Sequence, residues 1–349
     1  LSYLAKTRLY QAYTQDDNNN VTGTNSDKLN QVITLCNQVL SSSYGLETDF
    51  GNNFILSNKN GIESIFAIQY SVDDGTMFGR LNFGDVLGTP QGIGCCDFHK
   101  PSQNLVNAFK TDVNGLPLFA TFNNSDLDLN TNTVDPRIDH TVAIPGHMWK
   151  YDQSLIYQNS WTRTPEVYGY YASLKENVKR GQYIQVGPFY ANSKNKAIIR
   201  YDDVLLWKAE ALIELGRQNE AVSIINQIRT RAKNSTAMLQ FSNGSFQANY
   251  NINAYQPGVN CTWTQAYAKE ALRWERRLEL ALEGERFFDL VRWGIAQEYL
   301  NTYFTTEKTK RLYLKDGNFQ KNRDEYLPIP QNQIRFSHNL YKQNPGYIQ

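Results

Sequence analysis

Residues 271–294 read ALRWERRLELALEGERFFDLVRWG, a segment that combines the apolar spacing of a helix with a high density of charge. Two sets of apolar residues follow the i, i+3, i+4 spacing that lines one helix face: Leu278, Ala281 and Leu282, then Phe287, Leu290 and Val291. Gly284 lies between the two sets. Because glycine costs roughly 1 kcal/mol relative to alanine inside a helix, Gly284 predicts a break or a close packing contact.

Opposite charges in this segment recur at the i, i+3 spacing: Arg276–Glu279, Glu283–Arg286, Arg286–Asp289 and Asp289–Arg292. One interpretation is a structural helix pair whose arginines and carboxylates meet in a tight seam between helices. The other is a catalytic carboxylate pair, Glu279 with Glu283 or Glu285, acting as in glycoside hydrolysis. Arginines at almost every turn would keep these carboxylates ionised, which disfavours a general acid. The structural interpretation is therefore favoured.

The composition is that of a globular protein. The chain has 349 residues, enough for one large domain or two smaller ones, and a net charge of +1. This balance gives no reason to expect a nucleic-acid partner, and no run approaches the ~18 apolar residues of a membrane-spanning helix. Aromatic residues are frequent, with 22 Tyr, 17 Phe and 6 Trp. Such an excess is common both in sugar-binding proteins and in tyrosine-rich cores.

Helical hairpins are predicted at both ends of the chain. The first covers residues 1–14 and 26–43, with Ser26 or Asp27 as the N-cap of its second helix. Its first helix is amphipathic from Leu1, so we expect partner residues upstream of the sequence given. A short strand, IFAIQY, follows at residues 65–70. The clearest hairpin covers residues 201–232, with Asp202 or Asp203 as its cap and Gly216 at its turn. It is similar to a tetratricopeptide unit.

Residues 71–197 show no sustained helical periodicity apart from residues 101–110. A loop-rich insert of this length usually carries function or is held by small strands of its own. Within it, residues 126–132 alternate Asp and Asn as a calcium loop does, but Thr131 and Arg137 occupy the positions of the obligatory Gly and Glu of an EF-hand. We expect a solvated turn and no cofactor, with a loosely bound Ca²⁺ as the alternative.

The four cysteines give little evidence of a metal site. Cys36 lies in a helical pattern and is predicted to be a buried thiol. Adjacent Cys95 and Cys96 lack the two to four intervening residues of a zinc site. A bridge from one of them to Cys261 is left open. At the other end of the chain, Pro328 and Pro330 predict an extended tail packed across a surface.

Several separate segments resemble the SusD/RagB family of outer-membrane nutrient-binding lipoproteins. RRLELALEGERFFDLVRWG (276–294) is similar to the hallmark of that family almost residue for residue. NKAIIRYDDVLLWKAEALIELG (195–216) resembles its Arg-Tyr-Ala-Asp-Val-Leu-Leu helix, and YLPIPQNQI (326–334) and QNPGY (343–347) resemble its terminus. PSQNLVNAF (101–109) and DPRIDHTV (135–142) resemble internal markers of the family.

The resemblance implies a mainly α fold, in which tetratricopeptide-like hairpins form a frame around an irregular insert with a few short strands. Residues 1–70, 71–197 and 198–349 would then be the N-terminal hairpin, the ligand-binding insert and the C-terminal hairpins with the tail of one SusD-like domain. It also implies no catalytic residues, an N-terminal lipid anchor at the cell surface of the outer membrane, and a SusC-like TonB-dependent transporter as partner. The lipidated cysteine is not part of the sequence given.

Ligand-binding residues of the family lie on the insert and vary among its members, so the resemblance gives the region alone. One cluster of aromatic and polar residues in the insert could stack on sugar faces and bond hydroxyl groups: Trp149, Tyr151, Trp161, Arg163, Tyr168, Tyr170 and Tyr171. The alternative for any single ring is a place in the core. We therefore expect a non-catalytic binder of oligosaccharide or polysaccharide fragments. The alternatives are a peptide binder and, less favoured, a glycoside hydrolase.

Overall fold

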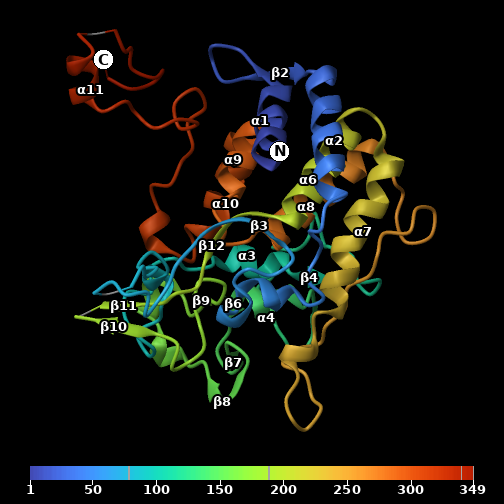
Figure 1. Cartoon of the computed structure of the whole chain (residues 1–349). Helices are drawn as coiled ribbons and strands as arrows, with labels where there is room; N and C mark the ends of the chain where they lie inside the picture. The colour runs from blue at the N-terminus through green and yellow to red at the C-terminus, as the bar shows by residue number, and fades with distance from the viewer. Residues whose placement is uncertain (78, 188, 339, 349) are drawn as a thin grey trace.

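The frame of the protein is built from helices that belong to both ends of the chain. A computed structural model describes residues 1–77, 79–187, 189–338 and 340–348. In it, α1 (Ser2–Ala12) pairs with α2 (Ser26–Leu40), and α6 (Tyr201–Glu214) pairs with α7 (Gln218–Asn234). The frame also contains α8 (Gln265–Glu279), α9 (Arg286–Arg292) and α10 (Ala296–Glu307), as Figure 1 shows.

Helix α6 is the centre of this frame, because it contacts α1, α2, α7 and α8. Trp207 and Ala211 pack toward the first hairpin, whereas Leu205 and Leu212 pack toward α7 and α8. A helix that is contacted on several sides is apolar nearly all round, as the segment LLWKAEALI is. Gly216, at φ +75°, ends the helix as predicted.

The caps of two helices differ from the prediction. Helix α2 is capped by Asn25, whose Oδ1 accepts a hydrogen bond from the amide nitrogen of Lys28 (3.0 Å), and not by Ser26 or Asp27. Helix α6 begins at Tyr201, so Asp203 lies within its first turn and accepts instead from the backbone nitrogen of Arg200 (3.1 Å). Both changes move the helix start by one to three residues, the usual error of sequence reasoning at boundaries.

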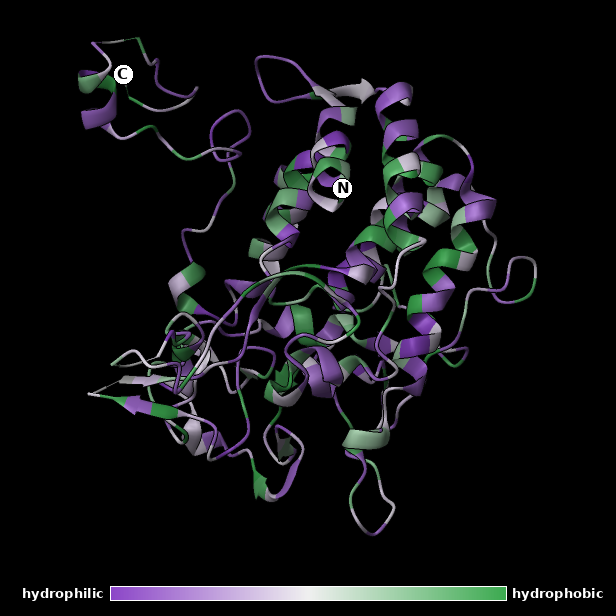
Figure 2. Cartoon of the chain, in the orientation of Figure 1, coloured by the Kyte–Doolittle hydropathy of each residue, from purple (hydrophilic) through white to green (hydrophobic). Residues whose placement is uncertain are grey.

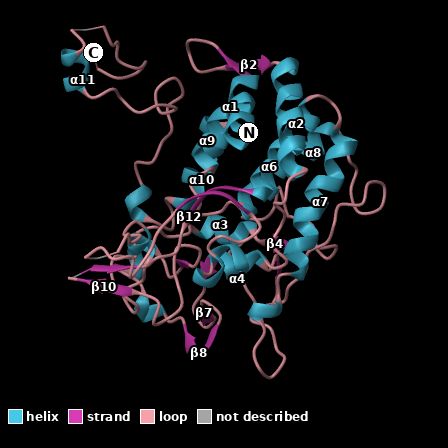
Figure 3. Cartoon of the chain, viewed as in Figure 1, coloured by secondary structure: helices cyan, strands magenta, loops and turns pink. Residues whose placement is uncertain are grey.

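The insert is held by short antiparallel strand pairs, which Figure 3 shows in magenta. Strand β3 (Ser64–Ile68) pairs with β12 (Lys196–Arg200), so the two ends of the predicted insert lie side by side. The other pairs are β1 (Tyr13–Gln15) with β2 (Val21–Thr24), β4 (Lys110–Thr111) with β5 (Thr133–Val134), β6 (Val142–Ala143) with β9 (Ala172–Ser173), β7 (Met148–Trp149) with β8 (Asp152–Ile156), and β10 (Ile184–Val186) with β11 (Phe189–Ala191).

Three short helices also lie in the insert: α3 (Gln103–Ala108), α4 (Arg137–Thr141) and α5 (Pro165–Tyr168). Helix α3 falls where residues 101–110 predict one. The mainly α class with a loop-rich insert and a few short strands is confirmed. The division at residues 70 and 197 stays a prediction. Figure 2 shows hydrophobic and hydrophilic residues mixed around the helices of the frame, as amphipathic helices require. Over the described residues, every helix is too short or too polar to serve as a membrane span.

The C-terminal tail is not packed across the surface as predicted. After Pro330 it forms α11 (Gln331–Phe336), and Figure 1 shows it projecting away from the frame. The tail bonds to itself: the Gln343 side chain accepts from the Ile329 amide (2.7 Å) and donates to the Ile329 carbonyl (2.9 Å). Leu327 remains 85% exposed. The Tyr326 hydroxyl also donates to the Gln15 side chain of β1 (3.2 Å), so the tail is held mostly by local hydrogen bonds and by this one bond to the first hairpin.

Candidate ligand-binding site

A buried lattice of arginine and carboxylate side chains joins α8 to the rest of the protein. Glu279, at the end of α8, accepts hydrogen bonds from Arg137 (2.8 Å) and from Arg231. Glu275, one turn earlier, accepts from Arg137 (2.6 Å) and Arg229 (3.2 Å). All these side chains are buried. The structural interpretation of residues 271–294, a tight seam of paired charges, is confirmed.

The partners in the lattice are mostly distant in sequence, whereas the i, i+3 spacing predicts local ones. Of the four local pairs, Asp289–Arg292 forms (2.7 Å). Arg276 instead forms a bidentate pair with Asp289, at 2.7 and 2.9 Å. Glu283 bonds to Lys175 (2.7 Å) and Arg200 (2.8 Å). The prediction of the other three local pairs is therefore wrong.

For Glu283 and Arg286 the physical reason is a break between α8 and α9, whereas Arg276 and Arg286 bond across the two helices, to Asp289 and to the Arg273 carbonyl, instead of along them. Leu282 and Gly284 adopt positive φ angles of +64° and +90°, so the chain turns there and does not continue as one helix. Side chains three residues apart across such a turn do not share a face. The break that Gly284 predicts is confirmed, and it releases Glu283 to meet partners from other elements.

The carboxylates proposed as a catalytic pair, Glu279 and Glu283, are held ionised, which is unfavourable for a general acid. Burial by itself raises the pKa of Glu279, but Arg231, Arg137 and Arg200 outweigh it and hold that pKa well below its usual range. For Glu283 the same balance of burial against Arg200 and Lys175 lowers the pKa to about 2. A group that must donate a proton near neutral pH needs the opposite shift.

Among the described residues, one group of acidic side chains is close enough to share a metal ion: Glu63, Asp202 and Glu279. Arg200 lies at 2.8, 2.7 and 3.5 Å from these three carboxylates. A guanidinium already occupies the position of a cation, so the group belongs to the lattice. In the loop at residues 126–132, the Asp128 carboxylate accepts from the backbone of Asn130 (3.0 Å), as in the solvated turn that the sequence favours. A loosely bound Ca²⁺ there stays the untested alternative.

The two tryptophans of the predicted aromatic cluster are packing residues of the insert. Trp149 is fully buried beside Ala143, Tyr157 and Leu174. Its ring lies 6.0 Å from that of the half-buried Trp161 and 5.9 Å from that of Tyr157. Trp149 therefore offers no free face to a sugar ring in this structure, which corresponds to the core alternative.

Three other members of the predicted cluster are partly engaged. The Tyr151 hydroxyl shares a hydrogen bond with Nδ1 of His140 (2.9 Å). Arg163 donates from Nε to the carbonyl of Cys96 (2.9 Å), and its guanidinium lies over the ring of Phe98 at 4.8 Å. Tyr171 packs half-buried against the apolar cluster around α3 and α4. The side chains of Tyr151, Arg163 and Tyr171 are thus partly used in contacts within the protein.

The remaining members, Tyr168 and Tyr170, are 40% and 45% exposed. Tyr313, which is 57% exposed, joins them, with its ring 5.4 Å from that of Tyr168. A side chain at Gly169 would collide with the Arg311 guanidinium, so Arg311 lies directly against the backbone between the two tyrosines. We call Tyr168, Tyr170, Tyr313 and Arg311 the tyrosine surface. Tyr313 and Arg311 were not predicted as site residues, because residues 311–313 lie far from the insert in sequence.

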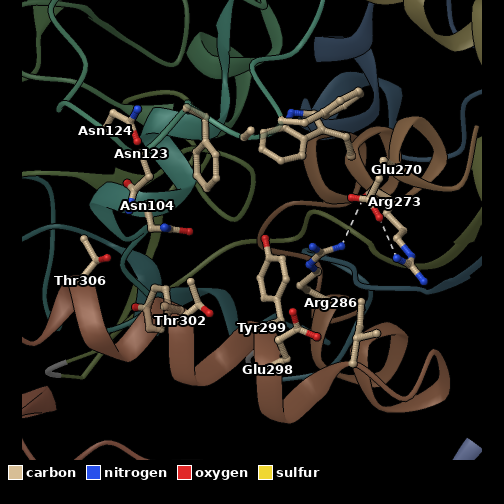
Figure 4. A pocket seen from close by; sticks show the side chains of 16 residues that line it. Asn104, Asn123, Asn124, Glu270, Arg273, Arg286, Glu298, Tyr299, Thr302 and Thr306 are labelled. Carbon is tan, nitrogen blue, oxygen red and sulfur yellow. Dashed lines mark hydrogen bonds and ion pairs between the residues drawn. The ribbon is translucent and has the colours of Figure 1, made fainter. Parts of the chain in front are cut away.

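A pocket of about 480 Å³ lies elsewhere, between α10, α8 and the segment that follows α3. Figure 4 shows Asn104, Asn123 and Asn124 at one end and Glu270, Arg273 and Arg286 at the other. Its aromatic walls are Phe119, Phe122, Trp274, Tyr299 and Tyr303. Trp274 is 5% exposed, so it is mainly a core residue whose edge reaches the pocket. The sequence does contain one indication of this pocket. Tyr299 and Tyr303 are an i, i+4 pair, so they share one face of α10.

The cysteines of the insert bond to each other. Cys95 and Cys96 form a disulfide, so the bridge to Cys261 that the sequence left open does not form, and Cys261 is a free thiol. Cys36 is buried in the core, as predicted, and burial raises its pKa to about 12.

Comparison with known proteins identifies the class of this protein. The model of the SusD family matches residues 62–347, most of the chain. The chain belongs to the SusD family, whose members are known as binding proteins rather than enzymes.

Named relatives agree with this assignment. The chain is 29% identical over 208 residues to SusD-like protein P2 of Formosa agariphila, a match that covers 58% of this chain and 34% of that protein. A SusD homolog from Bacteroides thetaiotaomicron aligns with a TM-score of 0.68 at 19% identity, over 99% of this chain and 63% of that one. Surface glycan-binding protein A from Bacteroides thetaiotaomicron aligns with a TM-score of 0.57 at 19% identity, over 98% and 62%. The structural similarities show the fold alone, and the chain spans less than two thirds of each of these proteins.

Proposed function

We propose that this protein is a non-catalytic, cell-surface binder of oligosaccharide or polysaccharide fragments. It hands these fragments to a SusC-like TonB-dependent transporter and is tethered to the outer membrane by an N-terminal lipid anchor. The family assignment and the name of a structural relative, a surface glycan-binding protein, support a glycan as the ligand. The lowered pKa values of Glu279 and Glu283 disfavour them as the general acid of the hydrolase alternative.

The tyrosine surface is the observation that carries the proposal. Two exposed rings, those of Tyr168 and Tyr313, come from segments far apart in sequence and lie 5.4 Å apart, and Arg311 packs against the backbone between Tyr168 and the exposed Tyr170. Flat aromatic faces accept the apolar face of a pyranose, and a guanidinium donates hydrogen bonds to its hydroxyl groups. Rings on an open surface suit a long polymer, since the chain can pass across without threading into a cavity.

The test is binding to a panel of soluble polysaccharides and peptides, measured by isothermal titration calorimetry. The Tyr168→Ala/Tyr313→Ala double variant should bind the preferred glycan at least about tenfold more weakly, a change of about 1.4 kcal/mol. Tyr44→Ala, at a tyrosine that is similarly exposed (38%) outside this surface, is the matched control. Its affinity should equal that of the wild type.

Two results would contradict the proposal. Release of new reducing ends from any polysaccharide of the panel would show catalysis. Binding to peptides, with none to the polysaccharides, would favour peptide capture instead.

A further inference from the structure

Two arginines at the pocket beside α10 lack the counter-charge found elsewhere in this protein: the half-buried Arg286, which lines the pocket, and the buried Arg277, which lines the hollow next to it. Each of the other buried arginines of the described chain has a carboxylate oxygen within 3.2 Å. Arg277, which is 7% exposed, donates to the carbonyl and side-chain oxygens of Asn104. Arg286 donates to the backbone carbonyl of Arg273 (3.1 Å). Neither forms an ion pair within the described residues, although a buried cation is normally paired.

Both guanidiniums retain unused donors. Nη1 of Arg277 and Nε of Arg286 are buried, and neither meets an acceptor in the described part of the chain. Aromatic faces hold the two groups in place: Arg286 lies 4.6 Å from the ring centre of Tyr299, and Arg277 lies 5.1 Å from that of Trp274. Packing thus sets the positions of the two guanidiniums. Each of them keeps one buried N–H donor that has no acceptor among the described residues.

Tyr299 adds a third donor between them. Its hydroxyl oxygen is buried without a hydrogen-bond partner among the described residues, and Figure 4 shows the hydroxyl end directed into the pocket. Burial raises the pKa of Tyr299, but Arg277 and Arg286 more than offset this, and the pKa falls below its ordinary value. The local field is therefore positive.

Three acidic residues lie nearby, and none of them forms an ion pair with Arg277 or Arg286 among the described residues. Glu270 is paired with Arg273 (2.7 Å), and Glu298 is an exposed residue of α10 that lines the pocket. Glu307 lies further along α10 without an ion-pair partner among the described residues, and burial raises its pKa. Arg286 and Tyr299 thus line the pocket without a carboxylate partner among the described residues, and Arg277 lies next to it in the same state.

The rest of the lining fits a sugar ring. The volume of about 480 Å³ is typical of small-ligand pockets. Asn123 and Asn124 present side-chain amides, which both donate to and accept from hydroxyl groups, at the end opposite Arg286 in Figure 4. The lining residues come from helices and loops and include no strand, so a peptide cannot dock here by extending a sheet.

We propose that this pocket binds a uronic acid residue. The carboxylate would be held by Arg286 and Tyr299, with Arg277 in the adjoining hollow behind Tyr299, and the pyranose ring would lie between the aromatic walls. The inference rests on the proposed function in that the acidic sugar is part of a glycan fragment. It adds a ligand class, acidic glycans, and a second place of contact apart from the tyrosine surface.

The probes are trisaccharides of galacturonic acid and of glucuronic acid, each compared with its fully methyl-esterified form. The ester keeps the ring and its hydroxyl groups and removes the charge. At low salt, at least one acid should bind wild-type protein about tenfold or more tightly than its ester. This preference should fall below about twofold in Arg286→Gln. Tyr299→Phe, which removes a single hydroxyl, should weaken binding of the acid about three- to tenfold with the melting temperature unchanged.

Arg217→Gln is the matched control, because Arg217 is an exposed arginine that is paired with Glu220 on the surface. It should keep the full preference. Equal binding of acid and ester by the wild type would overturn the inference, as would a preference that survives both Arg286→Gln and Tyr299→Phe. Tighter binding of an acidic tripeptide than of either sugar, lost in Arg286→Gln, would also overturn it.

The proposed function fails separately from this inference. The Tyr168→Ala/Tyr313→Ala variant should retain the acid preference, since it leaves the pocket intact. A protein that binds neutral polysaccharides through the tyrosine surface but shows no acid preference retains the proposed function and loses the uronic acid site. If the protein prefers the acid trisaccharide but binds no polysaccharide, the uronic acid site is retained and the proposed function is lost.

Discussion

Removal of the Glu279 carboxylate should destabilise the protein far more than it affects ligand binding. Glu279 is fully buried at the end of α8, where it accepts from Arg137 and Arg231 and lies 3.5 Å from Arg200. In Glu279→Ala, these three guanidiniums stay buried with one carboxylate fewer among them. Glu63 continues to neutralise Arg200 and Arg231, at 2.8 and 2.9 Å, so the lattice is weakened and not abolished.

The size of the effect follows from the burial of the charges. Breaking a buried ion pair by removing one partner costs about 3–5 kcal/mol, because an uncompensated charge remains. With an unfolding entropy of about 2.1 cal/mol/K per residue, each kcal/mol corresponds to about 1.4 °C for a chain of 349 residues. The melting temperature should therefore fall by about 4–7 °C.

The assay is thermal unfolding followed by circular dichroism, together with titration of the same preparation with the preferred glycan. Glu220→Ala removes an exposed carboxylate that is paired with Arg217 and should shift the melting temperature by less than about 1 °C. Glu279→Gln keeps the shape and should fall between the two. A Glu279→Ala protein that melts like the wild type but binds the glycan tenfold more weakly would refute the reasoning, since it would place Glu279 in a ligand site.

Three further predictions concern other parts of the structure. The folded-state pKa of Glu283, about 2, lies below its ordinary value of 4.5, so its contribution is complete above pH 4.5 and is lost as the pH falls toward 2. The gap in melting temperature between wild type and Glu283→Gln should shrink over that window, and a constant gap would contradict this. Trp149→Ala leaves a cavity at a fully buried site and should lower the free energy of unfolding by about 3–5 kcal/mol. Tyr170→Ala, at an exposed residue, should leave that free energy almost unchanged. Loss of glycan binding by Trp149→Ala at an unchanged melting temperature would instead make Trp149 a ligand contact. Asn25→Ala removes the cap of α2 and should cost about 1 kcal/mol by urea unfolding, and Ser26→Ala should not; the reverse order would show that the cap is Ser26.

The prediction for Trp149 shows where sequence reasoning about the candidate site stops. From the sequence, Trp149 and Tyr168 are equivalent members of one aromatic cluster. In the structure the first is a core residue and the second a surface residue, because β7 turns the side chain of Trp149 toward Tyr157 and Leu174. Residues 71–197 have no long period, so no pattern in the sequence distinguishes an inward ring from an outward one. The direct role of each predicted site residue in ligand binding stays a prediction.

The helical frame was more accessible to sequence reasoning. The hairpin at residues 201–232 and the break at Gly284 are both present, because amphipathic spacing and glycine act over a few residues and need no knowledge of distant partners. The family resemblance, carried largely by the charged residues of segment 276–294, is likewise confirmed.

The sequence by itself thus determined the family, the fold class, the main helices and the structural role of the charged segment at residues 271–294. Only the tertiary structure decided the partners of Glu279 and the burial of Trp149. It alone brought Tyr168 to Tyr313, and it alone placed Arg286 in a pocket, with Arg277 next to it, where neither has a carboxylate partner among the described residues. The physical reason is the range of the interactions. Helix formation depends on neighbours three or four positions away, whereas burial and ion pairing depend on elements that approach each other after the chain has folded.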